Sequence, residues 1–150
     1  MLSTGGLQKA NRFSIQVFLK DQAEASSRKP LLNHLKGHVF LIFDDDTFDL
    51  GETTLVNLGQ CLYQWSVNNS IVSPKNLIPL GSILPCPFGF IWNYQERSYA
   101  VFQWKNHTTP LRKIGFFDAL IAAKICIEEL CLLVKEKRLG DLRPLVEALR

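Results

Sequence analysis

The most apolar stretch of the chain, residues 116–134, places the strongest constraint on its fold. It is long enough to suggest a membrane span, but it contains the charged residues Asp118, Lys124, Glu128 and Glu129. Charged side chains are costly at the centre of a bilayer, so the stretch predicts a long buried helix. This helix should begin between residues 110 and 116 and end near Arg138, with Gly140 as the stop signal. The rest of the chain must therefore supply an apolar surface for it to cover.

The side chains of this helix divide into two arcs when they are placed at about 100° per residue. One arc is apolar and should face the core: Phe116, Leu120, Ile127, Leu130, Leu133 and Val134. The charged residues fall in the other arc, together with four large apolar residues: Phe117, Ile121, Ile125 and Leu132. A helix on a small sheet needs an apolar stripe only a little over 100° wide. The four extra residues are predicted to bind a partner, either another protein or a second copy of the chain, unless shorter helices of this chain cover them.

Two neighbouring segments rich in aromatic residues predict a β-hairpin. Residues 88–94 and 98–105 alternate like strands, and residues 95–97 would form a three-residue loop. This register sets Phe90 opposite Phe102 and Phe88 opposite Trp104, and the shared face would also carry Trp92. Aromatic pairs across two strands stabilise a sheet by roughly 0.2–1 kcal/mol each. We expect this face to be part of the core.

Other segments suggest shorter elements. Residues 13–19 and 39–43 are predicted strands, and residues 30–35 a helical turn. Asp49 and Glu52 have the spacing of a capping box, which predicts an amphipathic helix over residues 50–67. A last short helix should follow Asp141 and run through Ala148.

The predicted fold class is α+β: a small, mostly antiparallel sheet. Its aromatic hairpin, residues 88–105, would be covered on one face by the long C-terminal helix and a shorter amphipathic helix. Residues 1–11 contain small and polar residues without periodicity, so we expect a disordered arm there and one domain over residues 12–150.

The composition is that of an ordinary globular protein, with 47% apolar and 21% charged residues. The four cysteines have neither the spacing of a redox pair nor that of a metal site, which favours free buried thiols. The first residues lack the apolar core of a secretory signal, so a cytoplasmic location is expected. The net charge of +3 is too small to indicate nucleic-acid binding by itself.

The hairpin and its basic exit suggest one alternative function, binding of single-stranded nucleic acid. Proteins of that class stack bases on exposed aromatic rings and follow the phosphates with Lys and Arg. The candidate residues are Trp92, Tyr94, Trp104, Lys105, Arg112 and Lys113.

A second alternative function is Mg²⁺-dependent phosphate hydrolysis through Asp44 and Asp46. An apolar strand that ends in this pair resembles the first motif of haloacid-dehalogenase-like phosphatases. The resemblance implies that the first acid attacks phosphorus, that the second handles the leaving-group proton, and that Mg²⁺ lies between them. The glycine of that motif is missing, and Thr47 stands one position too early.

No catalytic constellation is complete in the sequence, and no cofactor is expected. The function that the sequence favours is therefore a non-enzymatic protein–protein interaction module, such as an adaptor, an assembly factor or an inhibitor of the immunity-protein kind. The extra apolar residues of the long helix carry this expectation.

Overall fold

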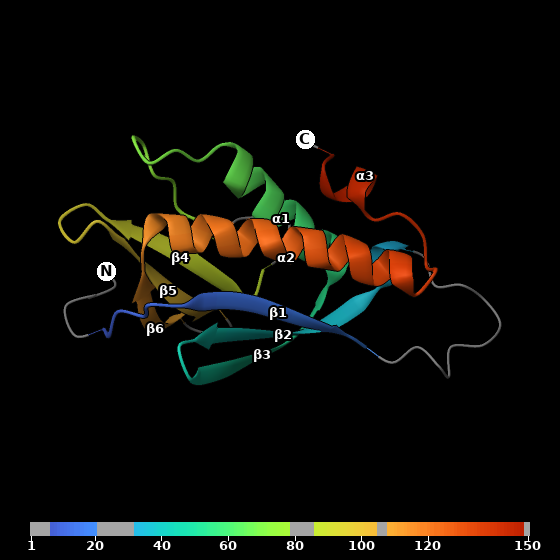
Figure 1. The fold of residues 1–150 in the computed structure, drawn as a ribbon, viewed down its shortest axis with the longest axis horizontal. Coiled ribbons are helices and arrows are strands. Elements are labelled where there is room, and N and C mark those ends of the chain that lie inside the picture. The colour runs from blue at the N-terminus through green and yellow to red at the C-terminus, as the bar shows by residue number, and fades with distance from the viewer. Residues whose placement is uncertain (1–6, 21–31, 79–85, 105–107, 149–150) are drawn as a thin grey trace.

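The fold contains two three-stranded antiparallel sheets and two main helices (Figure 1). This computed structural model describes residues 7–20, 32–78, 86–104 and 108–148. The strands are β1 (Phe13–Leu19), β2 (Lys36–Phe43), β3 (Asp46–Thr54), β4 (Phe88–Asn93), β5 (Ser98–Trp104) and β6 (Thr108–Ile114). The helices are α1 (Leu55–Val67), α2 (Phe116–Glu136) and α3 (Arg143–Val146), with a 3-10 turn, η1 (Leu32–His34), before β2. The order of three strands and a helix thus occurs twice along the chain.

The predicted α+β class is confirmed, although the strands form two sheets where the sequence suggested one. The strand orders are β1-β2-β3 and β4-β5-β6. The predicted strand over residues 13–19 is confirmed, the strand over 39–43 is part of β2, and the turn over 30–35 corresponds to η1. The last short helix is also present, and the Asp141 carboxylate accepts a hydrogen bond from the Arg143 amide (3.1 Å).

The predicted start of the first helix is wrong. Asp49 and Glu52 do not cap a helix but lie on β3, and α1 begins only at Leu55. The chain turns at Asp44 and Asp45, and Asp44 takes a positive φ of 51°, which aspartate tolerates better than most residues. Strand β3 then pairs with β2 along its whole length, and these long-range hydrogen bonds override the local capping pattern.

The predicted hairpin register is wrong by one residue. Phe88 lies opposite Gln103, Phe90 opposite Val101, and Trp92 opposite Tyr99. The turn has four residues, 94–97, and Arg97 within it adopts a positive φ of 53°. A slip of one residue exchanges the two faces of a strand. The side chains of Phe102 and Trp104 therefore lie on the opposite face of the sheet from Phe88, Phe90 and Trp92.

Strand β6 was not predicted, since the start of the long helix was expected between residues 110 and 116, and a proline within a strand is unusual. The structure accommodates it where the register shifts between Val101 and Phe102 of β5. The expectation of a disordered arm fails for residues 8–10, which pair with Lys113 of β6: its amide donates to Gln8 (2.9 Å), and its carbonyl accepts from Ala10 (2.8 Å). Residues 1–6 lie outside the described residues.

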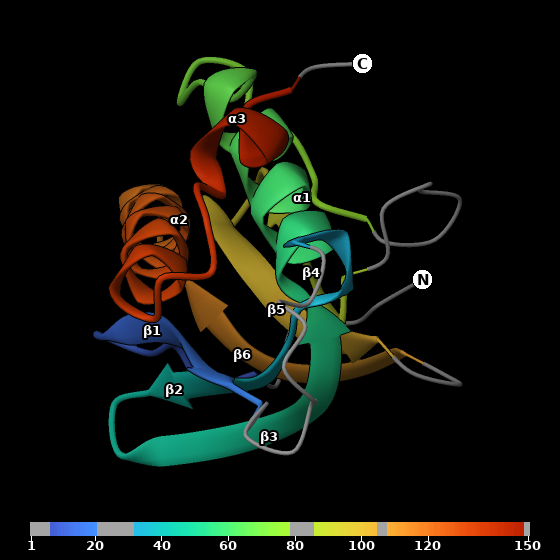
Figure 2. The same ribbon diagram turned by 90° about the vertical axis from the view of Figure 1, so that its right-hand side faces the viewer.

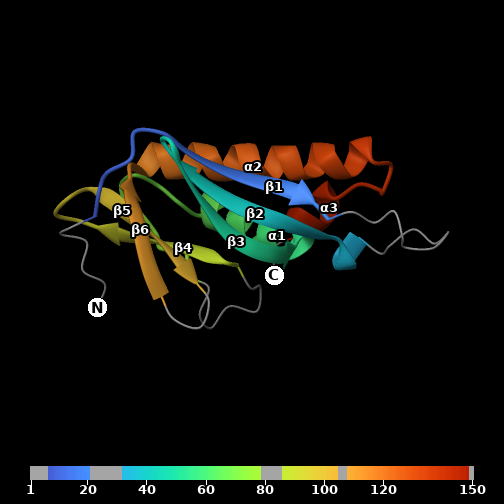
Figure 3. The ribbon, with the colours of Figure 1, turned by 90° about the horizontal axis from the view of Figure 1, so that it is seen from below.

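The two main helices lie side by side over the strands (Figure 2). Helix α1 packs between α2 and α3, and Trp65 at its C-terminal end contacts Phe90 of the second sheet (ring centroids 5.1 Å apart). Helix α2 runs alongside β1 in the same direction, as Figures 1 and 3 both show. The predicted inner arc of α2 is confirmed: Phe116, Ile127, Leu130 and Val134 are buried, and Leu120 and Leu133 are partly buried. Among the described residues, no helix combines the length and apolar character needed to cross a membrane.

Candidate protein-binding surface

The outward side of α2 carries a row of large apolar side chains. Phe117, Ile121, Ile125 and Leu132 are 55%, 53%, 50% and 55% exposed. We call these four residues the α2 stripe. Their spacing of four, four and seven residues places them on one side of the helix. The sequence separated these four residues from the core arc, and the structure leaves each of them about half accessible. That they bind a partner stays a prediction.

The α2 stripe faces outward because the other side of α2 is held firmly against α1. Small side chains, Ala119 and Ala123, are fully buried on the inner side of α2. Helix α3 packs on α1 instead, where Val146 approaches Gly59 so closely that a Cβ there would lie 2.6 Å from its methyl group. No described element therefore remains to cover the α2 stripe.

One charged residue interrupts the α2 stripe. Glu128 lies between Ile125 and Leu132 and binds Arg143, the first residue of α3 (2.7 Å). Arg143 also binds Glu147 (3.1 Å), and the hydrogen bonds that the guanidinium donates to these two carboxylates raise its pKa. The ion pairs direct the Glu128 carboxylate towards α3, so it does not cover the neighbouring apolar side chains.

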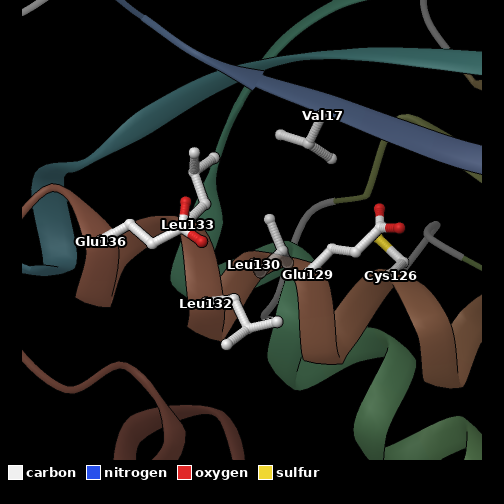
Figure 4. A pocket seen from close by; sticks show the side chains of 7 residues that line it. All are labelled: Val17, Cys126, Glu129, Leu130, Leu132, Leu133 and Glu136. Atoms are coloured by element: carbon white, nitrogen blue, oxygen red, sulfur yellow. The ribbon is translucent and has the colours of Figure 1, made fainter.

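Two hollows follow the side of α2 that adjoins β1. The smaller, of about 80 Å³, lies between residues 13–16 of β1 and the helix residues Ile121, Ala122, Ile125 and Glu129. The larger, of about 250 Å³, is lined by Val17, Cys126, Glu129, Leu130, Leu132, Leu133 and Glu136 (Figure 4). In Figure 4, Val17 on β1 faces Leu130 and Leu133 on the helix. Three residues of the α2 stripe thus border β1, a strand that the sequence did not connect with the candidate surface because its proximity depends on the fold.

The six residues of the nucleic-acid hypothesis do not form one platform. Trp92 is half-buried against Tyr99 and Phe116, with ring centroids 4.8 and 6.1 Å apart, whereas Trp104 packs on the other face against Phe102. Of the aromatic residues in the set, Tyr94 is the exposed one, at 74%.

The basic residues of that set have acidic partners within the chain. Arg112 binds Asp46 (2.5 Å) and lies over the Phe48 ring, and Lys113 binds Glu96 (2.6 Å). Lys105 lies outside the described residues. Neither Arg112 nor Lys113 is therefore available for a phosphate without breaking an ion pair.

The Asp44 and Asp46 carboxylates also have partners within the chain. Asp44 accepts hydrogen bonds from the amides of Asn11 (3.1 Å) and Arg12 (2.9 Å), which closes the end of the β1–β2 pair, and Asp46 binds Arg112. The pair lies at a hairpin tip that leads into β3, not into a helix. The described residues contain no group of three or more His, Cys, Asp or Glu side chains suited to hold a metal.

The expectation of free buried thiols is confirmed for all four cysteines. Burial raises the pKa of Cys126 to about 12 and also raises the pKa of Cys86, beside Cys61. The thiolate is the nucleophilic form, so Cys86 and Cys126 are unsuited to nucleophilic chemistry at neutral pH.

Comparisons of this chain with protein-family models, with characterised proteins and with solved structures found no match. The geometry of the α2 stripe and its neighbours is therefore the basis for inferring a function.

Proposed function

We propose that this chain is a non-catalytic protein-binding module and that the α2 stripe is its docking surface. The observation that carries the proposal is the alignment of four half-exposed apolar residues along one helix. Single exposed apolar residues are common on protein surfaces, but contiguous apolar rows indicate interaction sites.

The energetics of burial support a docking role. Removing the exposed half of an Ile, Leu or Phe side chain from water contributes roughly 1 kcal/mol. Four such contributions offset only part of the cost of association, so the partner must cover adjoining surface as well. The hollows beside β1 adjoin the stripe and provide such surface.

Site-specific photocrosslinking tests this proposal. A photoreactive residue at position 121 or 132 should give a covalent adduct with a protein in cells, because both positions lie on the stripe. Val72 provides the matched control: it is apolar and 89% exposed, but it lies in the loop after α1. Equal adduct formation from position 72, or none from the stripe, would contradict the proposal.

The two alternative functions receive less support from the geometry. Binding of single-stranded nucleic acid would require Arg112 and Lys113 to leave their carboxylate partners. Phosphate hydrolysis would require Asp44 and Asp46 to exchange protein partners for a metal. A cytoplasmic location remains a prediction from the sequence.

A further inference from the structure

The outer edges of the two sheets are protected to different degrees. In the second sheet, Leu77 exchanges two hydrogen bonds with Phe90 and covers β4 (2.9 Å each), while residues 8–10 cover β6. In the first sheet, the β3 edge carries exposed acids, Asp46, Asp49 and Glu52. Charges and added segments prevent the unwanted pairing of sheet edges.

Strand β1 has none of these protections among the described residues. Its sequence, FSIQVFL, contains neither a charge nor a proline over seven residues. Its partner in the sheet is β2, and no described strand lies on its other side. An uncharged edge of this length is suited to pair with another strand.

The backbone of β1 presents hydrogen-bonding groups on that open side. The amides of Asp44 and Lys20 donate to Arg12 and Lys36 (both 3.0 Å), so the even-numbered residues of β1 bond to β2. Bonded and non-bonded residues alternate in an antiparallel pair. The N–H and C=O groups of the odd-numbered residues therefore point away from β2. Four consecutive residues, 13–16, line the hollow beside α2, as expected when the edge of the strand faces it.

We propose that a second copy of this chain covers this edge, and that β1 of one copy pairs antiparallel with β1 of the other about a two-fold axis at Gln16. The inference rests on the proposed function and names the partner of the α2 stripe. This pairing joins the β1-β2-β3 sheet of one copy to that of the other in one continuous sheet of six strands.

The strand is complementary to itself in this register. Phe13 of one copy lies opposite Leu19 of the other, and Ile15 lies opposite Val17. In both pairs, residues whose N–H and C=O groups point away from β2 face each other and can exchange hydrogen bonds. A two-fold contact closes both edges at once, whereas head-to-tail addition would leave one open. The seven residues are uncharged, so pairing them buries no ionised side chain. The like charges Arg12 and Lys20 meet at the two ends of the pairing, and Lys20 already has Glu52 as a partner (3.5 Å).

The same contact covers part of the α2 stripe. Ile121 and Ile125 line the hollow together with residues 13–16, so a strand placed on the β1 edge contacts both side chains. The contact therefore removes two kinds of unsatisfied surface together: free backbone groups and exposed apolar side chains.

Sedimentation equilibrium of the purified chain and of Val17 variants provides the first test. We expect the wild type to dimerise reversibly, with most of it dimeric at about 100 μM. Val17→Pro removes an outward N–H but no bond to β2, so it should weaken the dimer more than tenfold. Val17→Ala is the matched control: it also loses the valine side chain but keeps the N–H, and it should remain dimeric. Thermal unfolding verifies that both variants fold.

A second pair of variants avoids any change to the backbone. Gln16 is exposed and would face its own copy across the axis. Gln16→Asp and Gln16→Lys each place like charges opposite one another and should weaken self-association by about fivefold, whereas an equal mixture should restore it. A chain that stays monomeric at about 100 μM would overturn the inference, and so would a dimer insensitive to Val17→Pro or to the Gln16 variants. If the chain is monomeric but position 121 still crosslinks to a different protein, this inference fails while the proposed function stands.

Discussion

The two halves of the chain share one element order but differ in how much apolar surface they leave open. Helix α1 of the first half packs between α2 and α3, and Leu58 and Leu62 are fully buried. Helix α2 of the second half packs against α1 on one side, and the four residues of the α2 stripe on its other side are half exposed. The sheets differ in the opposite sense: each outer edge of the second sheet pairs with a short segment, whereas no described segment pairs with the outer edge of β1 in the first.

Position in the fold, rather than the repeated element order, thus decides which surface remains exposed. Helix α2 and strand β1 belong to different halves, yet they run side by side (Figure 3). The open edge of one half therefore adjoins the exposed helix of the other. The apolar surface formed by β1 and the α2 stripe therefore contains residues from both halves of the chain.

The largest expected effect is a difference in stability between substitutions in α1 and in the α2 stripe. Leu62→Ala in α1 should lower the free energy of unfolding by about 2–5 kcal/mol, because it leaves a cavity around a fully buried side chain. Ile121→Ala in α2 should change it by less than about 1 kcal/mol, since half of that side chain is already in water and alanine favours helices. Urea unfolding of both variants measures the difference. Equal losses would show that α2 is as enclosed as α1.

A smaller effect should appear at high pH and tests the inner arc of α2. The pKa of Cys126 rises from 9.0 to about 12 on burial, so this thiol ionises in the unfolded chain before it does in the folded one. Well below pH 9, ionisation of Cys126 does not affect the free energy of unfolding. As the pH rises through 9 towards 12 this free energy falls, by about 1.4 kcal/mol at pH 10. Unfolding measured at pH 8 and pH 10 should show a smaller loss for Cys126→Ala than for the wild type. An equal loss would mean that this thiol is accessible to water.

The smallest expected effect concerns the ion pairs beside the α2 stripe. Arg143→Ala removes the contacts to Glu128 and Glu147, which are largely exposed and screened by solvent. Such pairs contribute roughly 0.2–1 kcal/mol, so the unfolding midpoint should move only slightly and added salt should reduce the difference further. A large loss that persists at high salt would indicate that α3 is needed to hold α2 in place.

Much of the helical structure could be predicted from the sequence, because helices depend on contacts close along the chain. The arcs of α2 follow from a period of 3.6 residues, so the spacing of side chains is enough to separate the inner arc from the four residues of the α2 stripe. The start of α1 was misplaced because Asp49 and Glu52 match a capping pattern by chance on a strand. A local pattern of two residues could not compete with the complete pairing of β3 with β2.

The sheets were harder to predict, since pairing joins residues far apart in sequence. The hairpin register depended on a turn one residue longer than expected, and this moved Phe102 and Trp104 to the other face. Because of the wrong register, Tyr99 was not predicted to lie in the core. Tyr99 is fully buried and donates a hydrogen bond to the Lys75 carbonyl (2.8 Å). Strand β6 was missed because residues 110–116 were expected to begin the long helix, and the register shift that accommodates Pro110 arises only from pairing with β5.

The α+β class, the long helix and the surplus of apolar side chains on its outer side could therefore be read from the local pattern of residues alone. Only the fold shows that no described strand pairs with the outer edge of β1, that short segments pair with β4 and β6, and that α2 lies beside β1. Side-chain periodicity is a local property that each segment carries with it. The exposure of a strand edge depends on which distant segments arrive to satisfy its hydrogen bonds, and no local pattern in β1 records whether one does.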